Sequence, residues 1–270
     1  MAKVNNTELK LAIELNMLED FVARIKDLTT LDNMVYMKFN NEKILLYCLS
    51  GAEKSDAVHA FKNHQLDTKV YFGDFESPEE DYKFCITNAK TFYNSISMFI
   101  KYMNSQKITD KLSFTFVYNE DFFVERVVIK NKKSQEQVSG GDVSVFKRKV
   151  TVEQINELMD KDKALFSFDL SKADYDYIKS KTLLEKDPND ACMPLYLNVK
   201  NNSIFIGETK WEHNVCEFLE TQDDIYSFPK KFFKCINFNG SLNVIVYVFD
   251  GFIMIEGSDS ILMIVTEMSV

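Results

Sequence analysis

The sequence predicts an α+β protein built from two similar halves, and three observations carry this prediction. Four stretches alternate apolar and polar residues about a short turn of Asn, Glu or Asp, the pattern of a β-hairpin. They are YMKFNNEKILLY from Tyr36, FTFVYNEDFFVE from Phe114, LYLNVKNNSIFIG from Leu195 and YVFDGFIMIEG from Tyr247. An extended run and a helix-like run precede each hairpin. The chain has 270 residues, 46% of them hydrophobic, which is enough for two ordinary domains. The predicted repeat is strand, helix, strand, strand, written four times.

In the N-terminal half, the extended runs ELKLAIEL and YKFCIT each lead into a predicted helix. The first helix is expected over residues 16–28, where Leu18, Phe21 and Ile25 recur at helical spacing. The second is expected over residues 88–103, with Asn88 as its N-cap. Both helices therefore have one apolar stripe to bury against the hairpins.

The C-terminal half repeats this order. ALFSFDL precedes a helix predicted over residues 171–184, which Ser171 can cap. DIYSF precedes a short helix predicted over residues 228–237, with Pro229 as its first residue. The two halves thus contain two repeats each.

The segments between the repeats set the predicted domain boundary. The polar stretch KNKKSQEQVSGGDV, residues 130–143, contains two adjacent glycines and is predicted to be a loop. An extended run, VSVFKRKV, follows it. The charged stretch TVEQINELMDKDK, residues 151–163, has few large residues and is the predicted connector. We expect an N-terminal domain over 1–150 and a C-terminal domain over 164–270.

Composition and motifs exclude several classes of protein. No apolar run approaches the roughly 20 residues of a membrane span, and MAKVNNTELK lacks the apolar core of a signal peptide, so we expect an intracellular protein without a membrane partner. There is no CxxC pair, phosphate-binding loop, HExxH or GxSxG motif. His59, His64 and His213 stand apart from cysteines and paired carboxylates. We therefore expect no metal, no cofactor and no enzymatic activity.

In its order and spacing of elements, the chain resembles the DNA sliding clamps, including the proliferating cell nuclear antigen and the clamps of T4-like bacteriophages. Two segments carry the resemblance, YSFPKKFFKCINFNGSLNVIVYVFDGFIMIEGSDSILMIVTEM from Tyr226 and VSVFKRKVTVEQINEL from Val143. It implies the two-domain clamp fold, with helices on the inner face and antiparallel sheets outside. It also implies a head-to-tail homotrimer around double-stranded DNA, which tethers a DNA polymerase and is opened by a separate ATP-dependent clamp loader. If the protein is viral, the host cytoplasm is its expected location.

The distribution of charge agrees with such a role. The formal net charge is −9, yet the four predicted helices carry ten basic and five acidic residues, so the helices sum to +5 and the remainder to −14. Duplex phosphates would meet a basic lining. For any single lysine, a solvated helix face is the alternative. The candidate DNA-binding residues are Arg24, Lys26, Lys90, Lys101, Lys172, Lys179, Lys181, Lys230, Lys231 and Lys234.

Two further surfaces are predicted. In similar clamps a pocket beside the connector takes a short partner peptide, and here the resemblance points to Val152, Ile155 and Leu158, which alternatively seal the domain core. Two runs of opposite charge are candidate subunit edges, unless both are merely solvated. The basic run contributes Val145, Phe146, Lys147, Arg148 and Lys149, and the acidic run contributes Val215, Glu217, Phe218 and Glu220.

Two other functions remain open from the sequence. A processivity subunit of the same fold could act on DNA as a monomer or dimer without forming a ring. A non-catalytic, β-rich structural protein of a virion would use the four repeats only as duplicated scaffolding, and would have no affinity for a polymerase.

Overall fold

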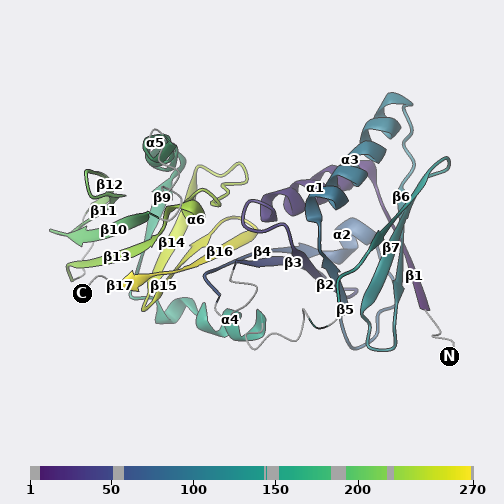
Figure 1. Ribbon diagram of the computed structural model, residues 1–270, viewed down its shortest axis with the longest axis horizontal. Helices are drawn as coiled ribbons and strands as arrows, with labels where there is room; N and C mark the ends of the chain where they lie inside the picture. The colour runs from purple at the N-terminus through teal and green to yellow at the C-terminus, as the bar shows by residue number, and fades with distance from the viewer. Residues whose placement is uncertain are drawn as a thin grey trace. The chain divides into compact units, whose positions relative to one another are not determined.

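A computed structural model describes residues 7–50, 58–142, 144, 152–183, 193–217 and 222–268 (Figure 1). The chain forms two compact units. One consists of Met1–Leu49 with Asn63–Lys149, and the other of Ser50–Lys62 with Val150–Val270. Residues 58–62 therefore belong with the C-terminal half of the chain, an arrangement that the sequence does not signal.

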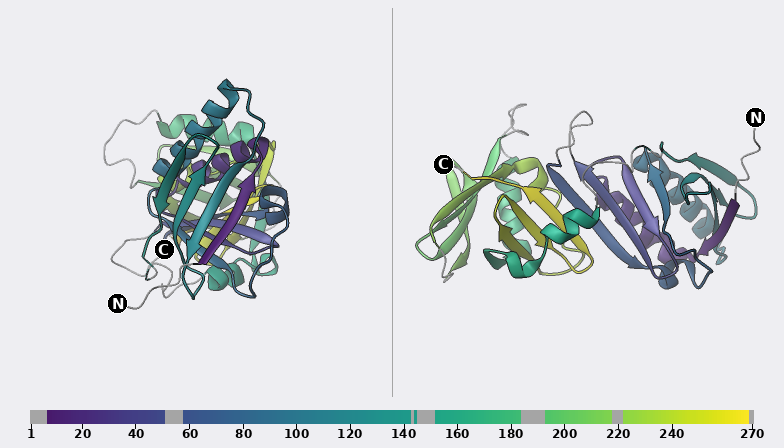
Figure 2. Two further views of the ribbon diagram at one scale, coloured as in Figure 1. Left: turned by 90° about the vertical axis from the view of Figure 1, so that its right-hand side faces the viewer. Right: turned by 90° about the horizontal axis from the view of Figure 1, so that it is seen from below.

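The N-terminal half of the chain contains two helices of several turns and eight strands. In chain order its elements are β1 (Thr7–Ile13), α1 (Leu15–Leu28), β2 (Val35–Phe39), β3 (Lys43–Ser50), β4 (Ala60–Asp67), α2 (Thr68–Phe72), β5 (Tyr82–Ile86), α3 (Ala89–Ser105), β6 (Leu112–Tyr118), β7 (Val124–Lys130) and β8 (Gln135–Ser139). One antiparallel sheet has the order β1-β6-β7-β8 and faces the viewer in Figure 2, left. A second run of strands has the order β5-β2-β3-β4.

The first unit is held together by one core between its helices and its sheets. Leu18, Phe21 and Ile25 of α1 are buried, as the helical spacing predicts, because one stripe of an amphipathic helix faces the sheet. From β2 and β6, Phe39 and Phe116 meet in this core with their ring centroids 5.0 Å apart. Aromatic packing across the two sheets therefore fixes where the helices sit.

The described residues of the C-terminal half also form strands and helices. A short helix α4 (Val152–Leu158) and a 3₁₀ turn η2 (Lys161–Lys163) come first. They are followed by β9 (Phe166–Ser171), α5 (Lys172–Leu183), β10 (Pro194–Lys200), β11 (Ser203–Glu208), β12 (Trp211–Glu217), β13 (Asp224–Pro229), α6 (Lys230–Phe233), β14 (Asn243–Phe249), β15 (Phe252–Glu256), β16 (Ser260–Val265) and β17 (Glu267–Met268). Two sheet orders occur, β12-β11-β10-β13-β17 and β16-β15-β14-β9.

All four predicted hairpins are confirmed, as β2-β3, β6-β7, β10-β11 and β14-β15. Their turns use the expected backbone chemistry. Asn201 and Asn202 between β10 and β11 both have positive φ, 52° and 58°, and Gly251 between β14 and β15 has φ 84°. Such conformations match the twist of paired strands and favour Asn and Gly.

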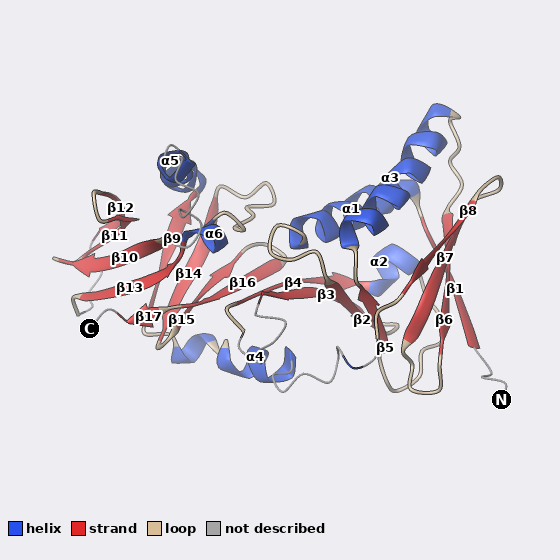
Figure 3. Ribbon diagram, in the orientation of Figure 1, coloured by secondary structure: helices blue, strands red, loops and turns tan. Residues whose placement is uncertain are grey.

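The repeat has one strand more than predicted. Three consecutive strands follow each of the four predicted helices, α1, α3, α5 and α6, and the additional strands are β4, β8, β12 and β16 (Figure 3). The prediction that residues 130–143 form a loop is wrong, because β8 lies within them and pairs Gln137 with Val128 of β7. This strand is polar on its exposed side, so its pairing depends on backbone hydrogen bonds that hydrophobic alternation does not reveal.

The helix predicted over residues 228–237 is also shorter than expected. It covers only Lys230–Phe233, and Pro229 is its N-cap and the last residue of β13 rather than the first helical residue. The backbone of Pro229 is extended, with ψ 121°, which keeps it in the strand. The other three helices lie within two residues of their predicted bounds.

Candidate nucleic-acid interface

Helices α1 and α3 lie side by side in the first unit (Figure 1). Together they carry three exposed lysines. Lys26 comes from α1, and Lys90 and Lys101 come from α3. Helix α3 contains no acidic residue over its 17 positions. Within the described residues, no ion pair is recorded for these three ammonium groups, so their charges face solvent.

The position of Lys90 and Lys101 follows from the packing of α3. Phe92, Ile96 and Met103 form its buried stripe. At about 100° per residue, both lysines fall roughly opposite that stripe, and they stand about 16 Å apart along the helix. Asn88 caps the helix as predicted, because its Oδ1 accepts the N–H of Thr91 at 3.1 Å. The face opposite the core is therefore a rigid, basic and acid-free row.

The side chain of Arg24 is less available to contact DNA than its position in the sequence implies. Its side chain is only 18% exposed and pairs with Asp20 at 3.0 Å, one turn earlier in α1. Burial raises the pKa of the Asp20 carboxyl, but hydrogen bonds from Tyr71 and Arg24 and the charge of Arg24 outweigh it and hold the pKa below its ordinary value. The Arg24 charge is thus shared with a local acid.

In the second unit, α5 carries lysines whose stems lie on aromatic rings. Lys179 Nζ lies 5.2 Å from the ring centroid of Tyr175, and Lys181 Nζ lies 5.5 Å from that of Tyr177. Both lysines are half-buried. Lys172 is exposed but pairs with Asp176 at 2.6 Å. Such contacts orient the lysines without neutralising the two that stack on rings.

The start of α5 is fixed by a small polar cluster. Ser171 is the predicted cap, and its Oγ accepts the N–H of Asp174 at 3.0 Å. His213 of β12 lies 2.7 Å from Asp174 through Nε2. Burial raises the pKa of Asp174, whereas the hydrogen bonds from Ser171 and His213 and the charge of His213 bring it below its ordinary value. This contact ties α5 to the neighbouring strand.

The expectation that Lys230 is exposed is wrong. Its side chain is 1% exposed and its Nζ lies 3.3 Å from Glu208 Oε1, itself only 11% exposed. A lysine that begins a four-residue helix directly after β13 is turned inward, where its charge requires a carboxylate partner. Lys231, the next residue, is exposed, and Lys234 is half-buried. Of the α6 candidates, Lys231 is therefore the most accessible to DNA.

The three candidate residues of the connector also differ in the exposure of their side chains. Val152 and Ile155 of α4 are 4% and 1% exposed, whereas Leu158 is 56% exposed. Lys161 of η2 holds the connector in place, because its Nζ bonds Glu256 at 2.7 Å and lies 5.4 Å from the Tyr247 ring centroid. Ile155 is thus part of the core, and only Leu158 has a side chain available to a partner.

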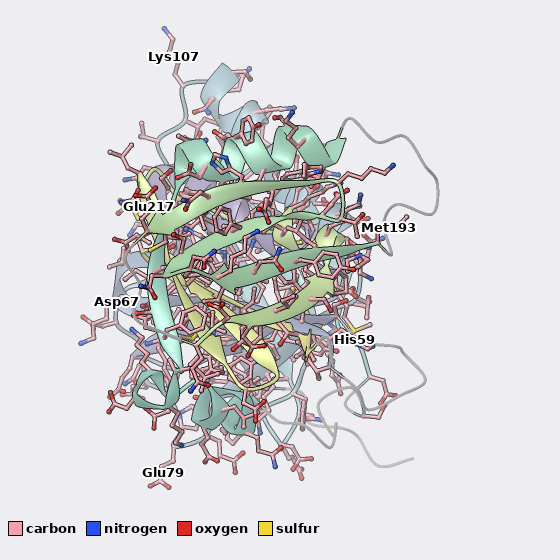
Figure 4. The ribbon with its side chains drawn as sticks, turned by 90° about the vertical axis from the view of Figure 1, so that its left-hand side faces the viewer. His59, Asp67, Glu79, Lys107, Met193 and Glu217 are labelled. Atoms are coloured by element: carbon pink, nitrogen blue, oxygen red, sulfur yellow. The ribbon has the colours of Figure 1, made fainter. Side chains whose placement is uncertain are left out.

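The acidic candidate edge is a real edge strand. In the sheet order β12 is terminal, and among the described residues it pairs only with β11. Val215 is half-buried and Glu217, labelled in Figure 4 at the end of this strand, is exposed. The remaining candidates for the subunit interface lie outside the described residues: Val145, Phe146, Lys147, Arg148, Lys149, Phe218 and Glu220.

Several exposed lysines are not among the DNA-binding candidates that the sequence predicts. Lys107, Lys111, Lys130, Lys132 and Lys133 are all exposed near the end of α3 and the β7–β8 turn. The KNKK run was visible in the sequence but was assigned to a loop. Only the pairing of β7 with β8 brings that run to the end of α3.

In the described part of the chain, no group of three or more His, Cys, Asp or Glu could hold a metal ion. No helix there is long and apolar enough to cross a membrane.

Comparison with solved structures identifies the fold as that of DNA sliding clamps. The β clamp of Helicobacter pylori bound to a DNA ligase peptide matches with a TM-score of 0.59 and 13% identity, over 96% of this chain and 66% of the clamp. A putative DNA polymerase III β subunit from Eubacterium rectale matches with 0.63 and 13% identity, over 99% and 67%. The DNA polymerase III β subunit of Pseudomonas aeruginosa matches with 0.62 and 9% identity, over 96% and 64%.

These neighbours share the architecture but little sequence. The chain spans about two thirds of the length of the clamps it matches. No protein-family model and no curated protein sequence matches it. The particular likeness to T4-like phage clamps and to the proliferating cell nuclear antigen therefore stays a prediction from the sequence.

Proposed function

We propose that this protein is a DNA sliding clamp, a ring that encircles duplex DNA without sequence specificity and tethers a DNA polymerase to its template. The observation that carries the proposal is the clamp fold itself, which matches over 96% or more of the chain. The exposed basic row of α1 and α3 supports it, because lysines on flexible stems make weak phosphate contacts that permit sliding. The clamp is a passive tether, and a separate ATP-dependent loader opens it.

The ring is a homotrimer that closes head to tail. The edge strand β12, with Val215 and Glu217, forms one side together with Phe218 and Glu220. The basic segment of the next subunit, with Val145, Phe146, Lys147, Arg148 and Lys149, forms the other. Unpaired strand edges are templates for pairing, and opposite charges select this pairing over self-pairing.

Client proteins dock at the connector through Leu158. Its exposed side chain is the one that a partner peptide can contact, while Val152 and Ile155 support it from the core. Structurally similar clamps provide a precedent for a bound partner, since one was solved with a DNA ligase peptide and another with griselimycin.

The proposal is tested by threading the protein onto linear DNA without a loader. After incubation at high protein concentration, the DNA ends are blocked with biotin and streptavidin, and the mixture is separated by gel filtration at high salt. A ring is retained on blocked DNA by topology and slides off open DNA, whereas electrostatic binding is screened equally in both. Equal loss from blocked and open DNA, or a strict monomer by sedimentation at high concentration, would contradict the ring.

The DNA-binding residues are tested in the same assay. Replacing Lys26, Lys90, Lys101 and Lys231 by Ala should lower threading and its dependence on salt, because fewer phosphates are neutralised. The matched control replaces Lys10, Lys43, Lys69 and Lys210, which are also exposed. Retention of wild-type threading by the first variant would rule out this lining.

A further inference from the structure

The C-terminal end of α3 builds an apolar corner in the first unit. The N–H of Ile108 bonds the carbonyl of Met103 at 2.9 Å, and the N–H of Lys107 bonds that of Asn104 at 3.1 Å. Lys107 has φ 52°, so the helix ends in a Schellman motif. Figure 4 shows Lys107 projecting from this end. The motif folds Ile108 back toward Met103, and both side chains face a cavity.

The cavity has a volume of about 490 Å³, within the range of sites that bind part of a peptide or a small ligand. Its apolar floor is formed by Tyr102, Met103 and Ile108. Its rim consists of Asp110, Lys111, Lys130, Lys132 and Lys133. A cavity with an apolar floor and four lysines is unusual on a chain whose net charge is −9.

The β7–β8 turn is held in a fixed conformation that delivers the rim lysines. Asn131 Oδ1 accepts the N–H groups of Lys133 at 2.9 Å and Ser134 at 2.7 Å. The N–H of Asn131 bonds the carbonyl of Ser134 at 3.0 Å, which closes the turn. These hydrogen bonds hold the Asx-type turn in one conformation. Placing the lysines at the mouth of the cavity therefore costs little backbone conformational entropy.

Two of the four rim lysines are already paired. Lys132 bonds Asp110 at 2.6 Å and Lys111 bonds Glu14 at 3.2 Å. Asp110 is thereby neutralised and does not repel an anion. No ion pair is recorded within the described residues for Lys130 or Lys133. The rim therefore keeps a local positive charge directed at whatever fills the cavity.

We propose that this cavity binds an acidic peptide segment of a partner protein, with an apolar side chain on the floor and carboxylates on Lys130 and Lys133. A docked anchor removes the half-buried Tyr102 and Ile108 from water, above a Met103 that is already buried, while the lysines select acidic flanks. A duplex would contact only the rim and leave the apolar floor unfilled, so the shape of the site favours a peptide over DNA. The site is separate from the basic row of α1 and α3 and does not depend on ring formation.

The test uses a fluorescein-labelled peptide with three acidic residues on each side of a Leu-Phe pair, measured by fluorescence anisotropy with the full-length protein. We expect Lys130→Glu with Lys133→Glu to weaken its binding by about tenfold or more, since two attractive contacts become repulsive. The control, Lys43→Glu with Lys69→Glu, makes the same charge change at exposed positions of the first unit and should bind like wild type. Replacing Leu-Phe in the peptide by Ser-Ser should also weaken binding.

Methyl NMR of Met103 and Ile108 locates the bound anchor, because their resonances should shift with the peptide and not with the Ser-Ser peptide. The proposal is overturned if no binding is detected at millimolar peptide, or if both double variants bind equally. It is also overturned if Lys130→Glu with Lys133→Glu affects only a labelled DNA duplex, which would assign the lysines to nucleic acid. None of these results bears on threading of the ring onto DNA.

Discussion

Lys230 and Lys231 are neighbours in the sequence and have opposite environments. Lys230 is 1% exposed and pairs with Glu208, whereas Lys231 is exposed. The sequence alone gives both the same interpretation, because the partner of Lys230 lies 22 residues away and is brought near only by the sheet. Charge counting along a helix therefore overstates the basic surface wherever a lysine is turned inward.

We expect Lys230→Met to lower the free energy of unfolding by about 3 kcal/mol, because it removes the ammonium group that faces the largely buried carboxylate of Glu208. Urea denaturation measures this change. Lys231→Met is the matched control and should change stability by less than about 0.5 kcal/mol, as for other exposed substitutions. Equal effects of the two variants would show that Lys230 is solvated after all.

The carboxyl of Asp20 should make stability depend on pH. Its pKa in the folded protein lies below the ordinary 3.8, so the unfolded chain binds more protons over the window beneath that value. Its stabilising contribution is present above the unfolded pKa and is lost as pH falls through the folded pKa. Asp20→Asn should flatten the decline of the urea midpoint below about pH 4.

Tyr71→Phe provides an independent check on the same carboxyl. It removes the hydroxyl that donates to Asp20 and should flatten the pH dependence in the same direction, although less than Asp20→Asn. If the urea midpoint of a variant falls with pH as steeply as that of wild type, Asp20 does not cause the loss of stability in acid.

At the scale of elements, those with a regular apolar stripe were predictable and those stabilised mainly by backbone pairing were not. Helix α3 was predicted within two residues, because its buried face repeats at helical spacing and Asn88 marks its start. Strand β8 was missed, because it is polar on its exposed side and lies at a sheet edge. Helix α6 was overextended, because Pro229 fits both the first position of a helix and the end of a strand.

The cap of α3 can be tested directly. Asn88→Ala removes the acceptor of the Thr91 N–H and should cost about 1 kcal/mol of unfolding free energy. Asn88→Ser, which retains a capping oxygen, should recover most of the loss. Chemical denaturation of both variants checks the prediction, and equal stability of Asn88→Ala and wild type would argue that the cap is dispensable.

Strand β12 depends on a close approach that only glycine permits. A Cβ at Gly207 would lie 2.2 Å from the carbonyl oxygen of Trp211. Gly207→Ala should therefore push β12 away from β11, lower stability by about 1–3 kcal/mol and accelerate hydrogen exchange over residues 211–217. Unchanged hydrogen exchange over these residues would mean that the two strands accommodate the methyl group without separating. Ser203→Ala, at the start of β11, is the control.

At the scale of the whole molecule, duplication made the fold predictable. Four hairpins and their helices predicted the α+β class, and the resemblance of their order and spacing to sliding clamps implied the clamp fold without any single diagnostic motif. The candidate site was harder to predict, because exposure depends on neighbours from other repeats. The oligomeric state is harder still to predict, because a head-to-tail interface depends on pairing between two different strand edges that lie far apart in the sequence.

The proposed trimer should respond to the edge strand. Val215→Asp with Glu217→Lys should dissociate the ring, because an unpaired carboxylate would enter the interface and the sign of the edge would be reversed. Sedimentation velocity over a range of concentrations measures the shift from trimer to monomer. Circular dichroism guards against unfolding, and a folded double variant that stays trimeric when dilute would place the interface elsewhere.

The assignment of Ser50–Lys62 to the second unit has a consequence for cutting the chain. His59 accepts the N–H of Val265 at 3.0 Å, and Lys62, 1% exposed, donates to the carbonyl of Cys235 at 2.7 Å. A protease cut in the connector therefore yields an N-terminal piece that contains the whole first unit and a C-terminal piece in which the second unit is incomplete. The C-terminal piece lacks residues that its own core requires. Those residues remain on the N-terminal piece, where they are separated from the contacts that they make in the intact protein. Cut fragments should hold together or reassociate when mixed, so the protein is a natural candidate for a split reporter.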